Sequence, residues 1–270
     1  FARRSAGTHC ARLARAVGVV RASHAPRTAL VVDRLLREGT QTATTTMGRG
    51  GHTATAATPA ATEELRRILG DAQRSKHTHE RGLARCLALV AEAPEVFAVD
   101  AQDEGGFFEH VTRVLVAKKR DGGVERCLAF VAKVCSGAVL QGGEAEADVA
   151  KRALLWLAKA AGAADKNARC RALELCALVL ERVVSEDGAE VDERVWTALS
   201  DAVVPRVSDK VAAVRKAACL ALRRLQEENP AATSALARAL ARDASADVRA
   251  AAARALDPSK KTVGLLLDRC

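Results

Sequence analysis

A repeated turn-and-helix pattern in the second half of the chain constrains the fold more than any other feature. Three segments place an Asp six residues before an Arg, and an apolar stretch follows each time: Asp165/Arg171, Asp209/Arg215 and Asp243/Arg249. The spacings between successive Asp residues are 44 and 34 residues. A period of this length indicates stacked helix-turn-helix units, because one such unit cannot bury its apolar face alone.

The residue types at the turn fit this architecture. An Asp or Ser before a helix caps its unpaired N–H groups, and the following Arg can reach the Asp of its own turn or of the next one. The helix expected over 168–184 is apolar around much of its circumference, which predicts neighbours on more than one side. The residues of its apolar face are Ala172, Leu173, Leu175, Cys176, Leu178, Val179, Leu180 and Val183. We therefore predict an all-α solenoid of the HEAT or armadillo type.

Weaker copies of the unit occur upstream. Residues 62–93 and 107–134 each read as two helices joined by a turn. Further turns are expected at 94–105, 121–123, 141–148, 185–190 and 227–231. Together these boundaries predict about five helix pairs over residues 61–270 and the start of a sixth, which looks truncated at its C-terminal end because solenoids need capping ends.

Composition agrees with helices and with a reduced interior. Aromatic residues make up 3% of the chain, Gly numbers 18 and Pro 6, which excludes an all-β fold. The eight cysteines form no C-x-x-C and mostly lie among Leu, Val and Ala, which predicts structural thiols of a cytosolic or nuclear protein. The aromatic residues in helical patterns are predicted to lie in the core: Phe97, Phe107, Phe108, Phe130, Trp156 and Trp196.

The formal charge of +9 lies mostly in the first sixty residues. Residues 1–60 carry nine Arg against two acids, whereas residues 61–270 carry 33 basic and 31 acidic residues. This Arg-rich, acid-poor composition is typical of an organelle transit peptide. Alternatively, translation begins at Met47, the one methionine of the sequence, and residues 1–46 belong to an untranslated upstream segment. On either interpretation we predict a disordered leader over residues 1–60.

Several segments, in order, resemble one family. The run DKVAAVRKAACLALRRLQEENP (209–230), with LARALARDASADVRAAAARAL after it, is similar to the N-terminal HEAT region of condensin complex subunit 3, the CAP-G type. So are DKNARCRALELCALVLERV, FFEHVTRVLVAKKRD with VERCLAFVAKV, and ILGDAQRSKHTHERGLARCL, which extends the resemblance over roughly 62–270. Alanine replaces many larger apolar residues of the family pattern.

The resemblance implies a non-catalytic subunit without a cofactor. Such subunits bind the kleisin subunit of condensin, act beside its SMC ATPase subunits and grip double-stranded DNA during mitotic chromosome condensation. It also implies a nuclear and chromosomal location, with a cytoplasmic fraction.

Duplex binding without sequence preference needs Lys and Arg side chains placed to meet phosphates. The basic residues at the expected turns are the candidates, because equivalent turns of a solenoid align along one edge. The predicted DNA-binding residues are Arg74, Lys76, Lys118, Lys119, Arg120, Lys166, Arg169, Lys210 and Lys216. Cations near helix C-termini also stabilise helices without any ligand. For Arg171, Arg215 and Arg249 we predict a structural role as ladder residues that bond to the Asp of their own turn or of the next one.

Enzyme and metal motifs are weak in this sequence. It contains no G-x-G-x-x-G and no P-loop, and its Gly pairs fall between expected helices. His77, His79 and Cys86 fit no metal-ligand spacing and are interpreted as residues of a helix junction, with surface histidines. No catalytic or metal-binding residue is assigned. Two alternatives stay open: a HEAT or armadillo scaffold that binds only protein, and an organelle-targeted helical repeat protein.

Overall fold

The computed structural model describes residues 58–98, 106–141, 144–185, 192–226, 229–259 and 262–267. The predicted leader, including Met47, lies outside these ranges apart from its last three residues. The α-helices are α2 (Pro59–Arg74), α3 (His79–Glu92), α4 (Phe107–Val116), α5 (Gly122–Gln141), α6 (Glu144–Ala160), α7 (Lys166–Ser185), α8 (Glu193–Val203), α9 (Ala212–Leu222), α10 (Pro230–Arg242), α11 (Ala246–Ala255) and α12 (Val263–Leu267). Short 3₁₀ turns join some of them: η2 (Lys76–Thr78), η3 (Pro94–Phe97) and η4 (Val204–Ser208).

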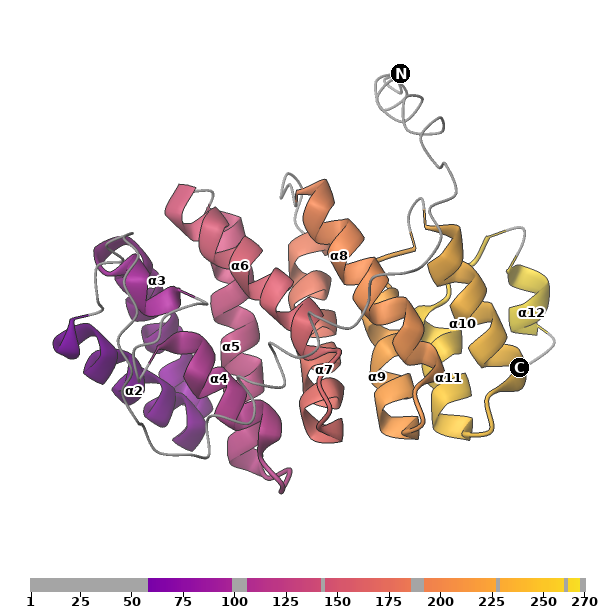
Figure 1. Ribbon diagram of the computed structural model, residues 1–270, viewed down its shortest axis with the longest axis horizontal. Coiled ribbons are helices and arrows are strands. Elements are labelled where there is room, and N and C mark those ends of the chain that lie inside the picture. Colours follow the sequence, from indigo (N-terminus) through magenta and orange to yellow (C-terminus); the bar gives the residue numbers. More distant parts are fainter. Residues whose placement is uncertain are drawn as a thin grey trace, which may run out of the picture.

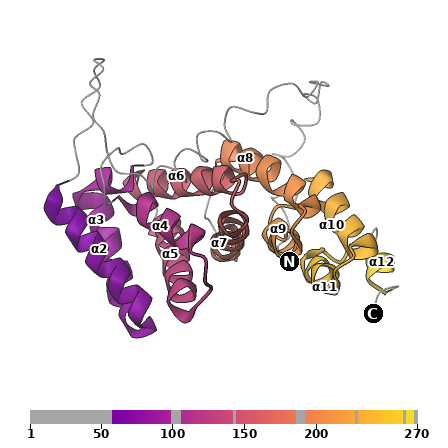
Figure 2. The ribbon, with the colours of Figure 1, turned by 60° about the horizontal axis from the view of Figure 1, so that its bottom comes forward.

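The helices form two stacked rows (Figure 1). In one row, α2 packs on α5, α5 on α7, α7 on α9 and α9 on α11. In the other row α3 packs on α6 and α6 on α8, and α10 packs on η4, which directly follows α8. The rows follow an arc with α7 and α9 on its inner side (Figure 2). This arrangement confirms the predicted all-α solenoid.

Local capping explains where several helices begin. Thr58 precedes Pro59 at the start of α2, and its hydroxyl accepts a hydrogen bond from the backbone of Ala61. Asn229 and Pro230 repeat this arrangement at the start of α10. A polar cap satisfies one of the free N–H groups of the first turn, and Pro fits there because it has no N–H to leave unpaired. These boundaries are therefore fixed by short-range sequence.

Small residues and a few aromatic rings fill the space between the rows. Between α9 and α11 the buried side chains are mainly alanines, including Ala218 and Ala252, so the helices can approach closely. The ring centroids of Phe97 and Phe107 lie 5.2 Å apart, and those of Phe108 and Trp156 lie 5.3 Å apart. This aromatic cluster joins the start of α4 to η3 and α6.

The core prediction is confirmed in most positions. Five of the six predicted aromatic residues are buried and Trp196 is partly buried; of the cysteines, Cys86, Cys127, Cys135, Cys176 and Cys219 are buried as free thiols. Burial raises the pKa of the Cys135 and Cys176 thiols to about 12, which keeps them protonated. Leu178 of α7 was expected on the apolar face but is 41% exposed.

Two details of the expected helix pairs are wrong. The glycine turn at 121–123 is the beginning of α5, because the Asp121 carboxylate accepts hydrogen bonds from the backbone N–H groups of Gly123 and Val124 and so caps the helix. Likewise α6 begins at Glu144, inside the turn expected at 141–148. The pairs α6–α7, α8–α9 and α10–α11 place their first and second helices in opposite rows. By contrast, α4 lies outside both rows, against α5 and α7.

Candidate nucleic-acid interface

Five connections between helices lie along one edge of the solenoid, the lower edge in Figure 1. We call them the turn edge and define it as residues 74–78, 117–121, 161–166, 204–211 and 243–245. Eight of the nine predicted DNA-binding residues lie in these segments or in the helix turns next to them, and Lys216 lies one turn further into α9. The alignment of the turns is set by arginine contacts between neighbouring units.

Two arginines join the N-terminal turns. Arg126, in the first turns of α5, donates from Nε to the carbonyl oxygen of Gln73 at 2.6 Å, which places α5 beside the end of α2. Arg171 is buried and donates from Nη1 to the carbonyl oxygens of Leu115 and Ala117 at 2.8 and 2.5 Å. These oxygens lie at the end of α4, where a helix has no partners of its own for its last carbonyls. Arg171 is therefore structural, as predicted.

Two ion pairs join the C-terminal turns. Arg169 pairs with Asp209 at 2.9 Å, and their side chains are only 6% and 5% exposed. One unit further along, Arg215 pairs with Asp243 through Nε and Nη2 at 2.7 and 2.8 Å. The result is the predicted ladder, in which an arginine of one unit bonds to the aspartate of the next.

The hydrogen bonds of the ladder favour the ionised aspartates. The Arg215 guanidinium holds the pKa of the Asp243 carboxyl below its usual value. At Asp209, burial by itself would raise the pKa, but the N–H of Val211 and the Arg169 guanidinium outweigh it and lower the pKa. Both carboxylates are thus kept charged by the same hydrogen bonds that connect neighbouring units.

In the first repeat, the structure assigns the ladder position to a different arginine than the sequence spacing suggested. Arg169, Arg215 and Arg249 are each the fourth residue of their helices, α7, α9 and α11. Each donates from Nη1 to the carbonyl oxygen six residues earlier, at Ala163, Asp209 and Asp243. The equivalent of Arg215 in α7 is therefore Arg169, and not Arg171 as the Asp165 spacing suggested. Asp165 instead caps α7, accepting from the backbone of Asn167 and Ala168 at 2.8 Å.

This register removes Arg169 from the predicted DNA-binding set. The residue is 5% exposed, and its guanidinium is bonded to Asp209 and to the carbonyl oxygens of Ala163 and Ala164. A phosphate could reach it only by breaking the ladder. The prediction for Arg169 is wrong because spacing alone did not show which cation of the turn faces the next unit.

Five predicted lysines are accessible. In the described part of the chain, their side chains make no ion pair, and most of their length lies in solvent. They are Lys76, Lys118, Lys119, Lys166 and Lys210. They fall on four successive turns of the turn edge, so the structure brings them to one edge as the solenoid argument expected.

The remaining predicted cations are engaged by carboxylates. Arg120 contacts Glu125 and lies 2.7 Å from Glu174, which raises its pKa and offsets its charge locally. Arg74 pairs with Asp71 at 2.5 Å while staying exposed. Lys216 lies 3.9 Å from Asp247 and is half-buried. These three cations are less available to phosphates than the five lysines.

The histidine junction also differs from the prediction. His79 is buried, 3% exposed, and its Nε2 lies 3.1 Å from the carbonyl oxygen of Ala72. Its ring packs on Phe130 with the centroids 5.2 Å apart. His79 is therefore a core residue and not a surface histidine, whereas His77 is exposed.

The described residues contain neither a candidate metal centre nor a candidate membrane span. No group of three or more His, Cys, Asp or Glu side chains there is arranged to hold a metal ion. No helix in those ranges combines the length and apolar character needed to cross a membrane.

Sequence reasoning missed Arg238 and Arg242 on α10. Both are exposed, and Arg242 is the last residue of α10, directly before the turn edge. The signal was present in the sequence, because the two arginines are spaced four residues apart and no acidic residue lies three or four positions from either. A cation without such a neighbour has no helix-surface partner of its own.

Comparisons with known proteins agree with this architecture. Condensin complex subunit 3 of Homo sapiens is 30% identical over 173 residues, which are 60% of this chain and 17% of the relative. The Xenopus laevis protein of the same name is 28% identical over 165 residues, 57% of this chain and 16% of the relative. The matched region thus spans about a sixth of the length of these relatives. No protein-family model matches the chain.

A solved structure has the same fold. The crystal structure of the S. pombe condensin Cnd3–Cnd2 subcomplex matches with a TM-score of 0.61 and 24% identity, over 76% of this chain and 25% of the matched one. This likeness confirms the HEAT-type helical solenoid. The resemblance inferred from the sequence is confirmed by the curated relatives.

Proposed function

We propose that this chain is part of a non-catalytic HEAT-repeat subunit of condensin that binds double-stranded DNA through phosphate contacts. In the cell it binds the kleisin subunit and works beside the SMC ATPase subunits, in the nucleus and on mitotic chromosomes. The similarity to condensin complex subunit 3 supports the assignment to this complex. The likeness to a two-subunit condensin structure supports a protein partner for the solenoid.

The five accessible lysines of the turn edge carry the DNA-binding part of the proposal. Duplex DNA presents a regular line of phosphates, and binding without sequence preference requires cations that are free to replace its counterions. Lysines repeated over four successive turns form such a line. The cations beside them that already have carboxylate partners would contribute less, because a phosphate must compete with an existing ion pair.

Lys118 and Lys119 provide the sharpest test. They are adjacent, exposed and without ion pairs in the described residues, whereas the neighbouring Arg120 bonds to two glutamates. We expect the variant Lys118→Glu/Lys119→Glu to bind a fluorescein-labelled duplex at least about tenfold more weakly at low salt. Arg120 is left unchanged so that the contact between α5 and α7 is preserved.

The matched control is Arg194→Glu/Arg254→Glu, which changes net charge by the same amount. Both arginines are exposed and lie at the helix ends opposite the turn edge, near the start of α8 and the end of α11. Equal weakening by both variants would show attraction by net charge alone and would contradict a site on the turn edge. Unchanged duplex affinity of the lysine variant would favour a scaffold that binds only protein.

The partner proposal has its own test. Affinity purification of the endogenous protein from mitotic cells is expected to recover kleisin and SMC subunits in comparable amounts. Recovery of neither would place this solenoid in a different assembly, whatever its affinity for DNA.

A further inference from the structure

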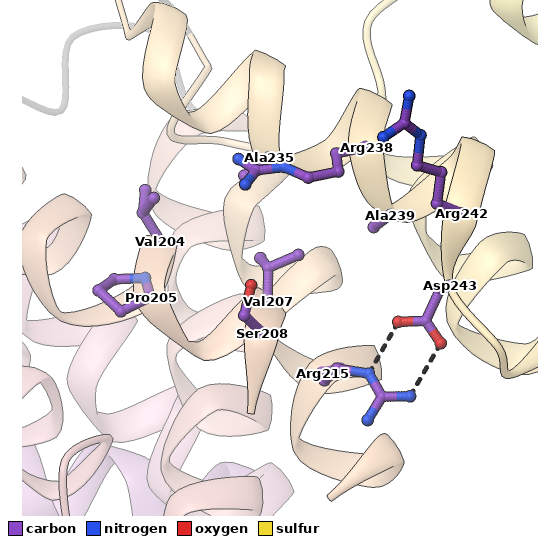
Figure 3. Close-up of a pocket in the computed structure, with 10 residues that line it drawn as sticks. All are labelled: Val204, Pro205, Val207, Ser208, Arg215, Ala235, Arg238, Ala239, Arg242 and Asp243. Carbon is purple, nitrogen blue, oxygen red and sulfur yellow. Dashed lines mark hydrogen bonds and ion pairs between the residues drawn. The ribbon is translucent and has the colours of Figure 1, made fainter. Parts of the chain in front are cut away.

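A pocket of about 390 Å³ lies between η4 and α10, in the second row of helices (Figure 3). Val204, Pro205, Val207 and Ser208 form the η4 side of the pocket. The α10 side is formed by Ala235, Arg238, Ala239 and Arg242, with the Arg215–Asp243 ion pair at one end. Its volume is enough for a few side chains of a peptide.

The lining carries uncompensated positive charge. Among the described residues of the lining, Asp243 is the one acid, and both its carboxylate oxygens already accept hydrogen bonds from Arg215. Arg238 and Arg242 form no ion pair or side-chain hydrogen bond within the described part of the chain. Since they are one helical turn apart on the same face of α10, both guanidinium groups are available to one ligand.

A second pocket shows that this charge is not a general feature of grooves in the solenoid. It has about 350 Å³ and lies between α2, α4 and α5, where Arg66 and Arg113 line it. There, each arginine is paired on its own helix, Arg66 with Glu63 and Arg113 with Glu109. The pocket beside η4 is thus distinguished by its two unpaired arginines.

The floor of the pocket beside η4 is apolar. Val207, Ala235 and Ala239 are buried and contribute hydrocarbon surface, and the exposed Pro205 adds a rigid ring to the lining on the η4 side. A DNA backbone meets exposed cations and gains nothing from such a floor. A peptide does, since an apolar side chain can fill the floor while neighbouring carboxylates meet the guanidinium groups.

We infer that this pocket docks an acidic segment of a partner protein, with an apolar side chain seated on Val207 and the α10 alanines and with Asp or Glu carboxylates bound to Arg238 and Arg242. The inference does not depend on DNA binding by the turn edge. It assigns the solenoid a second interaction surface, selective for negative charge.

The test uses the purified chain and a fluorescein-labelled octapeptide with two central leucines flanked by Asp and Glu. A matched probe replaces the acids with Asn and Gln. Fluorescence anisotropy is expected to show saturable binding of the acidic probe and at least about tenfold weaker binding of the amide probe. Absence of binding by the acidic probe up to millimolar concentration overturns the inference.

Two variants locate the binding. Arg238→Glu/Arg242→Glu is expected to weaken the acidic probe at least about tenfold, while Arg194→Glu/Arg254→Glu leaves its affinity within about twofold. Ser208→Trp keeps both arginines and fills the pocket from an exposed position that has no core contact to lose, and it is expected to weaken the probe similarly.

Two outcomes contradict the inference. Full affinity in Ser208→Trp would mean that the arginines act as a surface charge without a pocket. Loss of duplex DNA binding by Arg238→Glu/Arg242→Glu with unchanged peptide binding would assign the arginines to DNA. The peptide readout separates failure of this inference from failure of the proposed DNA site, which is measured by duplex binding to the Lys118/Lys119 variant.

Discussion

At the scale of single residues, the turn edge contains two kinds of cation that look alike in the sequence. Lys166 and Arg169 are three residues apart, yet Lys166 is exposed and Arg169 is bonded to the next unit. The planar guanidinium can donate to a carboxylate and to backbone carbonyls at once, whereas an ammonium group is a strongly hydrated point charge. The arginines therefore hold the units together and the lysines stay in solvent.

Removing Arg169 is expected to destabilise the protein. The variant Arg169→Ala leaves the nearly buried Asp209 carboxylate with a weaker partner, Arg206, at 3.6 Å. We expect a loss of about 3 kcal/mol in the free energy of unfolding, measured by urea denaturation followed by circular dichroism. The control is Arg66→Ala, which removes an exposed pair with Glu63 and should change the free energy of unfolding far less. Equal losses would contradict the ladder.

The same ladder predicts sensitivity to acid. The pKa of Asp243 is lowered in the folded state, so its stabilising effect is complete above the pKa of the unfolded chain and is lost as pH falls through the folded value. With an unfolded pKa of about 3.9, the loss begins below about pH 5. We expect the urea midpoint of the unaltered protein to fall on going from about pH 7 to about pH 3.5. The midpoint of Asp243→Asn should fall less over the same change of pH. An identical fall in both proteins would show that this carboxylate does not contribute.

At the scale of helices, glycine positions report how closely the elements pack. A Cβ atom added to Gly82 of α3 would lie 3.2 Å from ring atoms of Phe130 and 3.3 Å from Cγ2 of Ile68, so α3 meets α5 and α2 without room for a side chain. A Cβ atom added to Gly70 of α2 would meet nothing within 4 Å. A side chain at Gly82 would thus press on Phe130 and Ile68, whereas Gly70 has space for one and weakens its helix.

Substitutions at the two glycines should change the stability of the protein in opposite directions. Gly70→Ala is expected to stabilise the protein by about 0.5–1 kcal/mol, because Ala loses less backbone entropy in a helix. Gly82→Leu is expected to destabilise it by about 1–3 kcal/mol through overpacking against Phe130. Thermal unfolding followed by circular dichroism measures both. Stabilisation by Gly82→Leu would show that α3 can move away from α5 at little cost.

The sequence predicted the helices better than their arrangement. Periodicity, caps and breakers are local, so α7, α9 and α11 were expected close to where they occur. The position of α4 was not expected, because it depends on contacts far apart in sequence: Phe108 reaches Trp156 of α6, and Arg171 of α7 binds the last carbonyls of α4. Nothing within residues 107–134 specifies those partners.

At the scale of the whole molecule, the repeat places exposed lysines on four successive turns, where they form a line of charge. Neighbouring turns are fixed beside one another by Arg126, Arg171, Arg169 and Arg215, so the lysines cannot move apart independently. The near-neutral charge of residues 61–270 does not describe this edge, because Glu174 and Asp209 are bonded to Arg120 and Arg169 and not to the lysines. The proposed DNA site therefore rests on where the lysines lie and not on the bulk charge.

The salt dependence of duplex binding should show how many of these lysines contact phosphates. If all five contact phosphates, replacing Lys76, Lys118, Lys119, Lys166 and Lys210 by Ala should reduce the slope of log affinity against log salt by about 4 to 5 units. Fluorescence anisotropy at several salt concentrations gives the slope. A reduction of about 2 would restrict the phosphate contacts to about two of the lysines, and an unchanged slope would exclude the turn edge from the DNA site.

The sequence by itself determined the fold class and the repeating unit, because helix periodicity, capping residues and the Asp-to-Arg spacing act within one or two turns of chain. It also placed the basic residues at the connections between helices. The tertiary structure alone decided which of them are available. It buried Arg169 against Asp209 and engaged Arg120 with two glutamates, and it left Arg238 and Arg242 beside an apolar pocket with no ion pair to any described residue. The physical reason is that the partners of a side chain at a solenoid turn come from the adjacent unit, which lies 28 to 56 residues away in the sequence for the contacts of Arg215, Arg169, Arg126 and Arg171.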